Sequence, residues 1–209
     1  MKKRPVTPPD LMVSYQQEYL EAGCDEAGRG CYAGPVFAAA VILPPDFHHP
    51  LLNDSKQIKP SIRADLRTYI EANALAFAVA QVGVEEIDAI NILKASQKAM
   101  HLALAQLTPM PEFIAVDGNY FIPYKKTKHA CIVKGDGKLA NIAAASILAK
   151  THRDEYMQRI HQEFPQYNWA SNKGYGTLAH RDAIKQNGLC RYHRKSFNIL
   201  PVRSELFED

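Results

Sequence analysis

Cysteine is scarce in this chain of 209 residues, and none of it falls in a recognisable pairing motif. The four residues are Cys24, Cys31, Cys131 and Cys190, with no C-x-x-C pair and no histidines at zinc-finger spacing, so a structural zinc site is not expected. Cys24 and Cys131 lie in short apolar runs typical of strands, where a free thiol behaves as a small hydrophobic group. Unpaired thiols of this kind suit a reducing compartment, and we expect a cytoplasmic protein.

Long hydrophobic runs are also missing. The longest unbroken apolar stretch covers residues 36–43, far short of the roughly 20 residues needed to cross a bilayer. The N-terminus is basic like that of a signal peptide, but Pro5, Pro8, Pro9 and Asp10 stand where the apolar segment would be. We therefore expect no membrane span, no secretion signal and no membrane partner.

A strong excess of either charge is absent as well, because the formal net charge is only +3 and the sequence pI is near 8.6. This balance permits a polyanionic partner without requiring one. The basic side chains are nevertheless clustered. One group is Lys125, Lys126, Lys128 and His129, and the other is Arg191, His193, Arg194 and Lys195, interleaved with Tyr192. Each cluster could bind phosphate or could be a solvated face, and the sequence leaves both interpretations open.

Composition divides the chain into three parts. Residues 1–19 form a proline-rich arm with no strand or helix periodicity, which we expect to be loosely held. Residues 20–164 contain the apolar runs of one α/β domain. Residues 165–209 contain a glycine loop and a short helical pattern near residues 179–186, which predicts a small C-terminal helical cap.

Within residues 20–164 the hydrophobic pattern predicts five strands and three helices. Strands are expected at 22–25, 36–43, 75–84, 113–116 and 130–133, and helices at 60–73, 85–107 and 138–164. The first three strands can form an antiparallel meander. The order of elements implies an α/β fold with a mixed five-stranded sheet covered by helices.

Acidic residues stand at three predicted strand ends, next to glycine. They are Asp25 with Glu26, Asp117, and Asp136. Any one Asp-Gly dipeptide is a common turn, but carboxylates on neighbouring strand ends can converge at one edge of a sheet. Hard divalent ions such as Mg²⁺ and Mn²⁺ bind to oxygen clusters of this kind. Because adjacent strand residues point to opposite faces, Asp25 and Glu26 can share a metal site only if the strand ends or bulges there.

The segment 28–33 also fits the loose dinucleotide-binding pattern G-x-G-x-x-G/A. That pattern requires a helix to open at the glycines, so that its N-terminus meets the pyrophosphate. Here Gly34-Pro35 and a strand-like run follow instead. A nicotinamide or flavin site is therefore disfavoured.

Ordered motifs along the chain resemble those of type 2 ribonuclease H, the ribonuclease HII family of bacteria. The opening signature is Gly23-Cys-Asp-Glu-Ala-Gly-Arg-Gly30 followed by Ala33-Gly-Pro-Val36. Further segments that agree, in the family's order, are 53–56, 86–93, 116–119, 134–136, 143–150 with Arg153-Asp154, 173–175 and 193–197. The resemblance covers roughly residues 20–200. One departure is Cys31-Tyr32, where many members have Pro-Leu.

The resemblance implies an RNase H-like fold in which a C-terminal helical extension completes the substrate site. The four metal-site acids of the family correspond to Asp25, Glu26, Asp117 and Asp136. The glycine-arginine-glycine element that approaches the ribose 2′-hydroxyl corresponds to Gly28, Arg29 and Gly30. Tyr175 matches the tyrosine that packs on the sugar at the RNA-to-DNA junction, and Lys56 matches a lysine near the scissile phosphates. Ser146 and Lys150 are expected only to support the site.

The activity implied by the resemblance is cleavage on the 5′ side of ribonucleotides in RNA/DNA hybrids, or of single ribonucleotides within duplex DNA. Two Mg²⁺ or Mn²⁺ ions would serve as cofactors, and the products would carry a 3′-hydroxyl and a 5′-phosphate. Primer removal and ribonucleotide repair in DNA are the expected tasks. We expect a monomer; contact with a sliding clamp is possible, but nothing in the sequence supports it. The alternative is a catalytically inactive nucleic-acid-binding module on the same fold, which the presence of all four acids disfavours.

Overall fold

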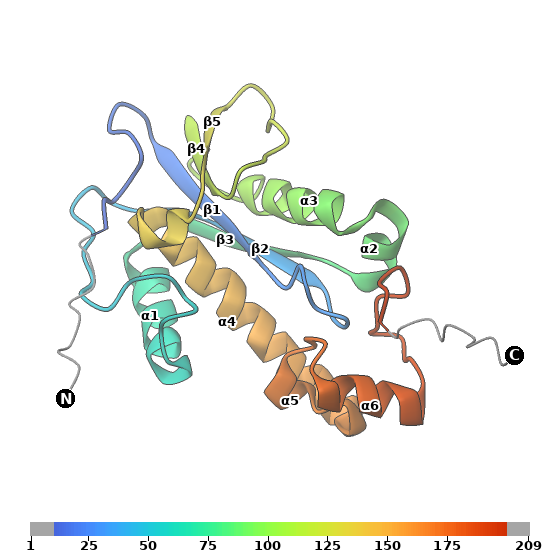
Figure 1. Ribbon diagram of the computed structural model, residues 1–209. Coiled ribbons are helices and arrows are strands. Elements are labelled where there is room, and N and C mark those ends of the chain that lie inside the picture. The colour runs from blue at the N-terminus through green and yellow to red at the C-terminus, as the bar shows by residue number, and fades with distance from the viewer. Residues whose placement is uncertain (1–10, 200–209) are drawn as a thin grey trace, which may run out of the picture.

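A mixed five-stranded sheet forms the centre of the computed structural model, which describes residues 11–199 (Figure 1). Its strands are β1 (Glu21–Ala27), β2 (Val36–Ile42), β3 (Ala76–Val82), β4 (Phe113–Asp117) and β5 (Lys128–Ile132). They lie in the order β3-β2-β1-β4-β5. The first three strands are antiparallel neighbours, while β4 and β5 run parallel to β1. The predicted meander and the mixed sheet are confirmed.

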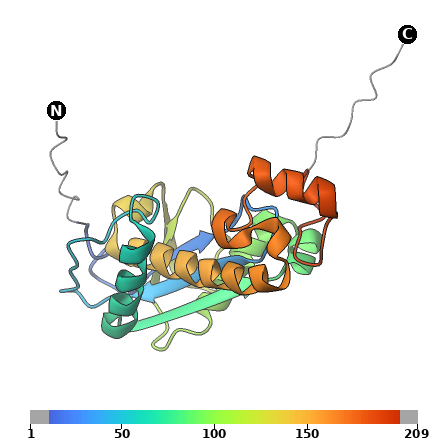
Figure 2. The same ribbon diagram turned by 90° about the horizontal axis from the view of Figure 1, so that it is seen from below.

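Helices cover both faces of this sheet (Figure 2). They are α1 (Pro60–Asn73), α2 (Val84–Ile90), α3 (Ile92–Leu104), α4 (Ala140–Glu163), α5 (Trp169–Asn172) and α6 (Leu178–Asn187). In β2, Ala38 and Ala40 join the core beneath α3, whereas Ala39 and Val41 join the core beneath α1 and α4. The two-residue period of a strand divides its side chains in this way, and small alanines let both helix layers approach closely.

The single helix predicted over residues 85–107 is wrong. The chain forms α2 and α3 there, and Asn91 separates them with a φ of 69°. The side chain of Asn91 accepts a hydrogen bond from the backbone N–H of Lys94 and so caps α3. Apolar residues of both helices, among them Ile87, Ile90, Ile92 and Ala95, contribute to one core cluster, so their spacing does not reveal the break.

The C-terminal cap has a small core of its own, packed on the last turns of α4. Its largest members are Met157, Ile160, Tyr167, Trp169 and Ile184. The short helix α5 inside this cap has no counterpart among the predicted elements. The cap joins the sheet domain through residues 31–35, so it is fastened beside the loop that follows β1.

The arm is held more firmly over residues 11–19 than its composition predicts, and residues 1–10 lie outside the described part of the chain. Met12 forms a parallel bridge with Leu139. The carbonyls of Met12 and Val13 accept hydrogen bonds from the backbone N–H groups of Ala140 and Asn141. These N–H groups belong to the first turn of α4, where no intrahelical partner exists. The arm therefore caps α4.

The two strand thiols differ in their surroundings. Cys24 is buried, but Cys131 is exposed, so the expectation that Cys131 packs as a core residue is wrong. Cys131 lies on β5, the edge strand beyond β4, where one face has little cover. Among residues 11–199, no helix is long and apolar enough to cross a membrane.

Candidate active site

The first pair of acids lies where β1 leaves its parallel neighbour. Pairing of β1 with β4 stops at Cys24 opposite Val116, while pairing with β2 continues in regular register to Ala27. The strand therefore ends on one side only, and it does not bulge. The Glu26 carboxylate turns towards Arg29, with 3.2 Å between Oε1 and Nη1. Asp25 is almost fully buried and accepts a hydrogen bond from the backbone N–H of Glu26.

The other two acids meet across the ends of β4 and β5. Asp117 is the last residue of β4, and its Oδ1 accepts a 2.7 Å hydrogen bond from the backbone N–H of Gly135. Asp136 follows in a short 3₁₀ turn, Gly135–Gly137, with only 4% of its surface exposed. Its buried Oδ2 has no hydrogen-bond partner among the described residues. The Nζ of Lys56 stands 3.7 Å from this oxygen, as an ion pair rather than a hydrogen bond.

Burial and neighbouring negative charges raise the pKa values of three of these carboxylates. Burial, followed by the negative charges of Glu26 and Asp117, raises the pKa of Asp25 well above its ordinary value. Burial also raises the pKa of Glu26, despite the nearby Arg29. For Asp136, burial and then the charges of Asp117 and Asp54 raise the pKa. Asp54 is an acid at this site that the sequence analysis did not single out.

A divalent cation fits this set of groups. Carboxylates whose pKa values are raised by burial and by neighbouring negative charges, together with an unpartnered buried oxygen, gain most from a neighbouring positive charge. Among residues 11–199, however, no three His, Cys, Asp or Glu side chains form a ready-made metal cage. This openness suits Mg²⁺, which usually keeps several waters and uses a few carboxylates together with substrate phosphates.

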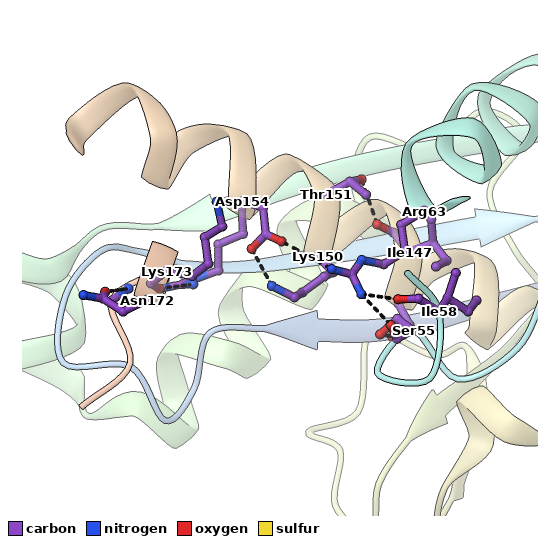
Figure 3. A network of polar contacts seen from close by, with 12 residues as sticks. Ser55, Ile58, Arg63, Ile147, Lys150, Thr151, Asp154, Asn172 and Lys173 are labelled. Carbon is purple, nitrogen blue, oxygen red and sulfur yellow. Dashed lines mark hydrogen bonds and ion pairs between the residues drawn. The ribbon is translucent and has the colours of Figure 1, made fainter. Parts of the chain in front are cut away.

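The loop before α1 supports the acids from the side. Ser55 and Ser146 are joined by a 3.0 Å hydrogen bond between their hydroxyls, and the Ser146 hydroxyl opposes the rise in the pKa of Asp25. Arg63 donates from one nitrogen to the carbonyls of Ser55 and Ile58, at 2.9 and 2.6 Å (Figure 3). These bonds fix the loop that presents Lys56. Ser146 thus has the supporting place that was predicted for it.

The glycine-arginine-glycine loop is held from behind by a buried arginine. Arg194 donates to the carbonyls of Gly28, Arg29 and Gly34 at 2.7, 2.9 and 3.0 Å, and its side chain is fully buried. Burial lowers the pKa of Arg194 to about 10, so the guanidinium remains charged at neutral pH. Arg194 therefore cannot belong to an exposed phosphate-binding cluster, and neither can the buried His193.

A second buried arginine joins this loop to the cap. Arg153 of α4 donates to the carbonyls of Ala33, Pro35 and Lys173 at 3.0, 3.0 and 2.8 Å. Lys173 is two residues before Tyr175. The side chain of Arg153 therefore fixes the loop after β1 and the segment that carries Tyr175 relative to one another. The sequence analysis assigned no role to Arg153, because its partners lie 20 to 120 residues away in the chain.

The two glycines of the loop serve different purposes. Gly28 has a φ of +98°, and a Cβ there would stand 2.0 Å from Nε of Arg153. Gly28 is therefore required by the backbone and by its packing. Gly30 has no such φ, and a Cβ would meet nothing within 4 Å. The space in front of Gly30 is open for a ligand.

Tyr175 reaches the surface beside this loop. It is 43% exposed, and its backbone forms an antiparallel bridge with Cys31. Tyr32 brackets it, because the N–H of Tyr32 donates to the Gly174 carbonyl and the ring packs against Gly176. The hydroxyl of Tyr32 accepts a 2.8 Å hydrogen bond from Arg181 of α6. Of these contacts, those that depend on the departure from Pro-Leu are made by the ring and hydroxyl of Tyr32, which pack on Gly176 and bind Arg181.

Two buried histidines hold the same loop from the cap. The Tyr175 carbonyl can only accept, so Nδ1 of His180 donates to it at 2.9 Å. The indole N–H of Trp169 can only donate, and it lies 3.0 Å from Nε2 of His180, so this Nε2 is an acceptor. The same Nε2 lies 3.2 Å from Nε2 of His193. The Cys190 N–H donates to Nδ1 of His193, which leaves Nε2 of His193 to donate. Both rings are therefore neutral.

The sequence matches one family model over most of its length. The model described as Ribonuclease HII covers residues 22–200. A curated protein named Ribonuclease HII from Christiangramia forsetii is 58% identical over 187 residues, which is 90% of this chain and 94% of that protein.

Solved structures share the fold. Ribonuclease H2 from Pyrococcus horikoshii aligns with a TM-score of 0.72 and 25% identity, covering 86% of this chain and 94% of the other. Bst-RNase HIII, solved in complex with Mn²⁺, aligns with a TM-score of 0.69 and 17% identity over 86% of this chain and 67% of the other. The mixed five-stranded sheet with flanking helices is the RNase H fold predicted from the sequence.

Proposed function

From the premise that this chain belongs to the ribonuclease HII family and is a ribonuclease H endonuclease, we propose that it cuts on the 5′ side of ribonucleotides in duplexes. The substrates are RNA/DNA hybrids and duplex DNA with embedded ribonucleotides. The products carry a 3′-hydroxyl and a 5′-phosphate. Removal of primers and of misincorporated ribonucleotides during DNA replication and repair, in the cytoplasm, follows as the proposed biological role.

One observation carries the proposal: burial and the charges of neighbouring carboxylates raise the pKa values of Asp25, Glu26 and Asp136, and Asp117 contributes one of those charges to each of them. In our proposal they hold Mg²⁺ or Mn²⁺, which would activate water and stabilise the leaving oxygen. Lys56, 3.7 Å from Asp136, provides a positive charge for the phosphate that is cut. The chain itself supplies no nucleophile.

Selection of the sugar is assigned to the loop and to the cap. Gly30 leaves open space in front of the backbone, where a ribose can approach main-chain groups of residues 28–30. Tyr175 is exposed beside it and can pack on the adjoining sugar. Because Arg194 and Arg153 fix these segments before any substrate arrives, little conformational freedom is lost on binding.

The test is cleavage of a duplex that contains one ribonucleotide, compared with the same duplex made wholly of DNA, each with Mg²⁺ and with EDTA. We expect cutting only at the ribonucleotide and only with the metal. Equal cutting of both duplexes would contradict the assignment of Gly28, Arg29, Gly30 and Tyr175 to the ribose. Binding without cleavage under all conditions would favour an inactive binding module.

A further inference from the structure

A groove of about 890 Å³ runs between α1, α4 and α5, on the cap side of the acids. Its charged lining includes Arg63, Lys150, Asp154 and Lys173, which follow one another along α4 in Figure 3. The Ser55 loop, held by Arg63, lies at one end, and Lys173 lies at the other, two residues before Tyr175. The groove therefore extends from the loop that carries Lys56, which is proposed to face the phosphate that is cut, towards Tyr175, which is proposed to pack on the sugar.

Most of the acidic groups in this groove are already engaged. Glu71 and Glu155 pair with Arg67 at 2.8 and 2.9 Å, and His152 also contacts Glu71. Asp154 is then the remaining carboxylate of the lining.

Several cations share Asp154. Lys150 donates a hydrogen bond to it, and Arg63 lies 3.9 Å from it. The buried guanidinium of Arg153 adds a further positive charge just behind the groove, where its donors are used by carbonyls. One carboxylate cannot neutralise this group of cations, so the end of the groove at Lys173 carries excess positive charge.

Lys173 is the cation left without a partner. Across residues 11–199 its half-buried ammonium has no hydrogen bond and no ion pair. Burial lowers the pKa of Lys173, and the charges of Lys150, Arg153 and Arg63 lower it further, against the effect of Asp154. A partly desolvated cation among like charges gains from an anion at this place.

The geometry points to a binding site for an uncut backbone phosphate, formed by Lys173 with Lys150 and Arg63 around Asp154. Its ligand rests on the proposed function. The sugar of a nucleotide is joined to phosphates on both sides, so a strand whose sugar packs on Tyr175 brings a phosphate to this end of the groove. The acids lie beyond the other end, so this phosphate positions the strand and is not the one that is cut.

The experiment measures the affinity of the full-length protein for duplex DNA in EDTA, as a function of salt. A lysine that neutralises one phosphate contributes about 0.9 to the slope of log affinity against log salt. We expect Lys173→Met to reduce the slope by about one, equally for an all-DNA duplex and for one with a ribonucleotide. Lys173→Arg, which keeps the charge, should retain the wild-type slope.

Lys185→Met is the matched control, because Lys185 is an exposed lysine of the cap that pairs with Asp182. Its slope should equal that of the wild type. A wild-type slope for Lys173→Met, with an unchanged melting temperature, would overturn the phosphate site. Binding in EDTA requires no cleavage, so failure of this site and failure of the proposed function can be distinguished. If the protein cuts at ribonucleotides but Lys173→Met leaves the slope unchanged, only the phosphate site is wrong.

Discussion

Beside the first turns of α4, Asp25 and Asp136 are buried carboxylates with raised pKa values, and one Asp136 oxygen has no hydrogen-bond partner. About two turns of α4 beyond Ser146, Arg153 places its donors on three carbonyls, and Arg194 does the same on the neighbouring loop. At the acidic end a buried carboxylate oxygen has no hydrogen-bond partner among the described residues, whereas at the arginine-held end each guanidinium donates to three carbonyls. In the proposed function, the group that binds a cation has an unpartnered buried oxygen, and the groups that recognise the sugar are fixed before the substrate binds.

This contrast predicts that the two ends respond to mutation in opposite ways. At the acidic end, removal of a charge should abolish activity and spare the fold. At the arginine-held end, removal of a charge should weaken the fold and impair activity as a consequence.

The largest expected effect is on activity, for Asp25→Asn and Asp136→Asn. Loss of one metal-binding carboxylate should reduce cleavage by about a thousandfold or more, because the metals contribute several kcal/mol of transition-state stabilisation. The metal-free fold should be as stable as the wild type or more stable, since a repulsive charge is gone. Thermal melts with EDTA and with Mg²⁺ check this.

In the same melts, Mg²⁺ at ten times its dissociation constant should stabilise the wild type by about 1.4 kcal/mol per site, and the variants by less. If either variant melts clearly lower than the wild type in EDTA, that aspartate is a structural residue and the contrast fails at this end.

The largest expected effect on stability is for Arg194→Met. Each hydrogen bond to a charged group contributes about 1.5 to 3 kcal/mol, so loss of three should lower the free energy of unfolding by about 4.5 kcal/mol or more. Arg191→Met is the control in the same basic cluster, because Arg191 is exposed and its contacts, an ion pair with Glu163 and the rings of Phe164 and Tyr192, lie at the surface. It should change stability by less than about 1 kcal/mol. Urea unfolding of both variants measures this, and similar losses would show that the burial of Arg194 is unimportant.

A smaller pair of effects separates the two glycines. Gly28→Ala should destabilise the protein by about 2 kcal/mol, because alanine is strained at a φ of +98° and its methyl group meets Arg153. Gly30→Ala should leave the melting temperature unchanged and reduce cleavage at the ribonucleotide, because its methyl group would occupy only the open space. A normal cleavage rate for Gly30→Ala would show that this space is not used by the substrate.

The smallest expected effect is a dependence of stability on pH through the buried histidines. Burial and then the neighbouring His180 lower the pKa of His193 to about 4, and burial lowers the pKa of His180. The unfolded chain takes up protons first, near the ordinary histidine pKa of about 6.5. Stability is therefore complete above about pH 6.5 and falls as the pH drops towards 4.

Melts of the wild type and of His193→Asn between about pH 7.5 and 5 test this dependence. The groups that face His193 are His180, Tyr167, Trp169 and Cys190. The variant should start lower at the higher pH and lose less on acidification. Parallel curves for the two proteins would assign the pH dependence to other groups.

The sequence predicted the sheet well because strands that are buried between helices appear as short, unbroken apolar runs. Residues 36–43 and 113–116 are examples, and their ends located Asp117 at the sheet edge. The break at Asn91 was missed, although an asparagine inside a helical pattern is a recognisable N-cap signal. Helical periodicity reports which residues face the core, and Ile87 and Ile90 of α2 face the same core cluster as Ile92 and Ala95 of α3.

The arginine-held end could not be predicted in the same way. Arg194 reaches carbonyls 160 to 166 residues away, and no spacing within the sequence encodes such a contact. A basic cluster near the C-terminus looked uniform, yet Arg194 is fully buried while Arg191 is exposed. Side chains that bind the backbone leave no periodic trace, so their role emerged only from the folded chain.

The length of α4 has a consequence for where a strand is cut. Ser146 stands beside the acids and Arg153 beside the loop that follows β1, and the seven residue steps from one to the other rise by about 10 Å. An inserted residue would lengthen that interval by about 1.5 Å and rotate Arg153 by about 100° away from its carbonyls. If the proposed function holds, the number of residues in this part of α4 sets the distance between the sugar that is recognised and the phosphodiester that is cut.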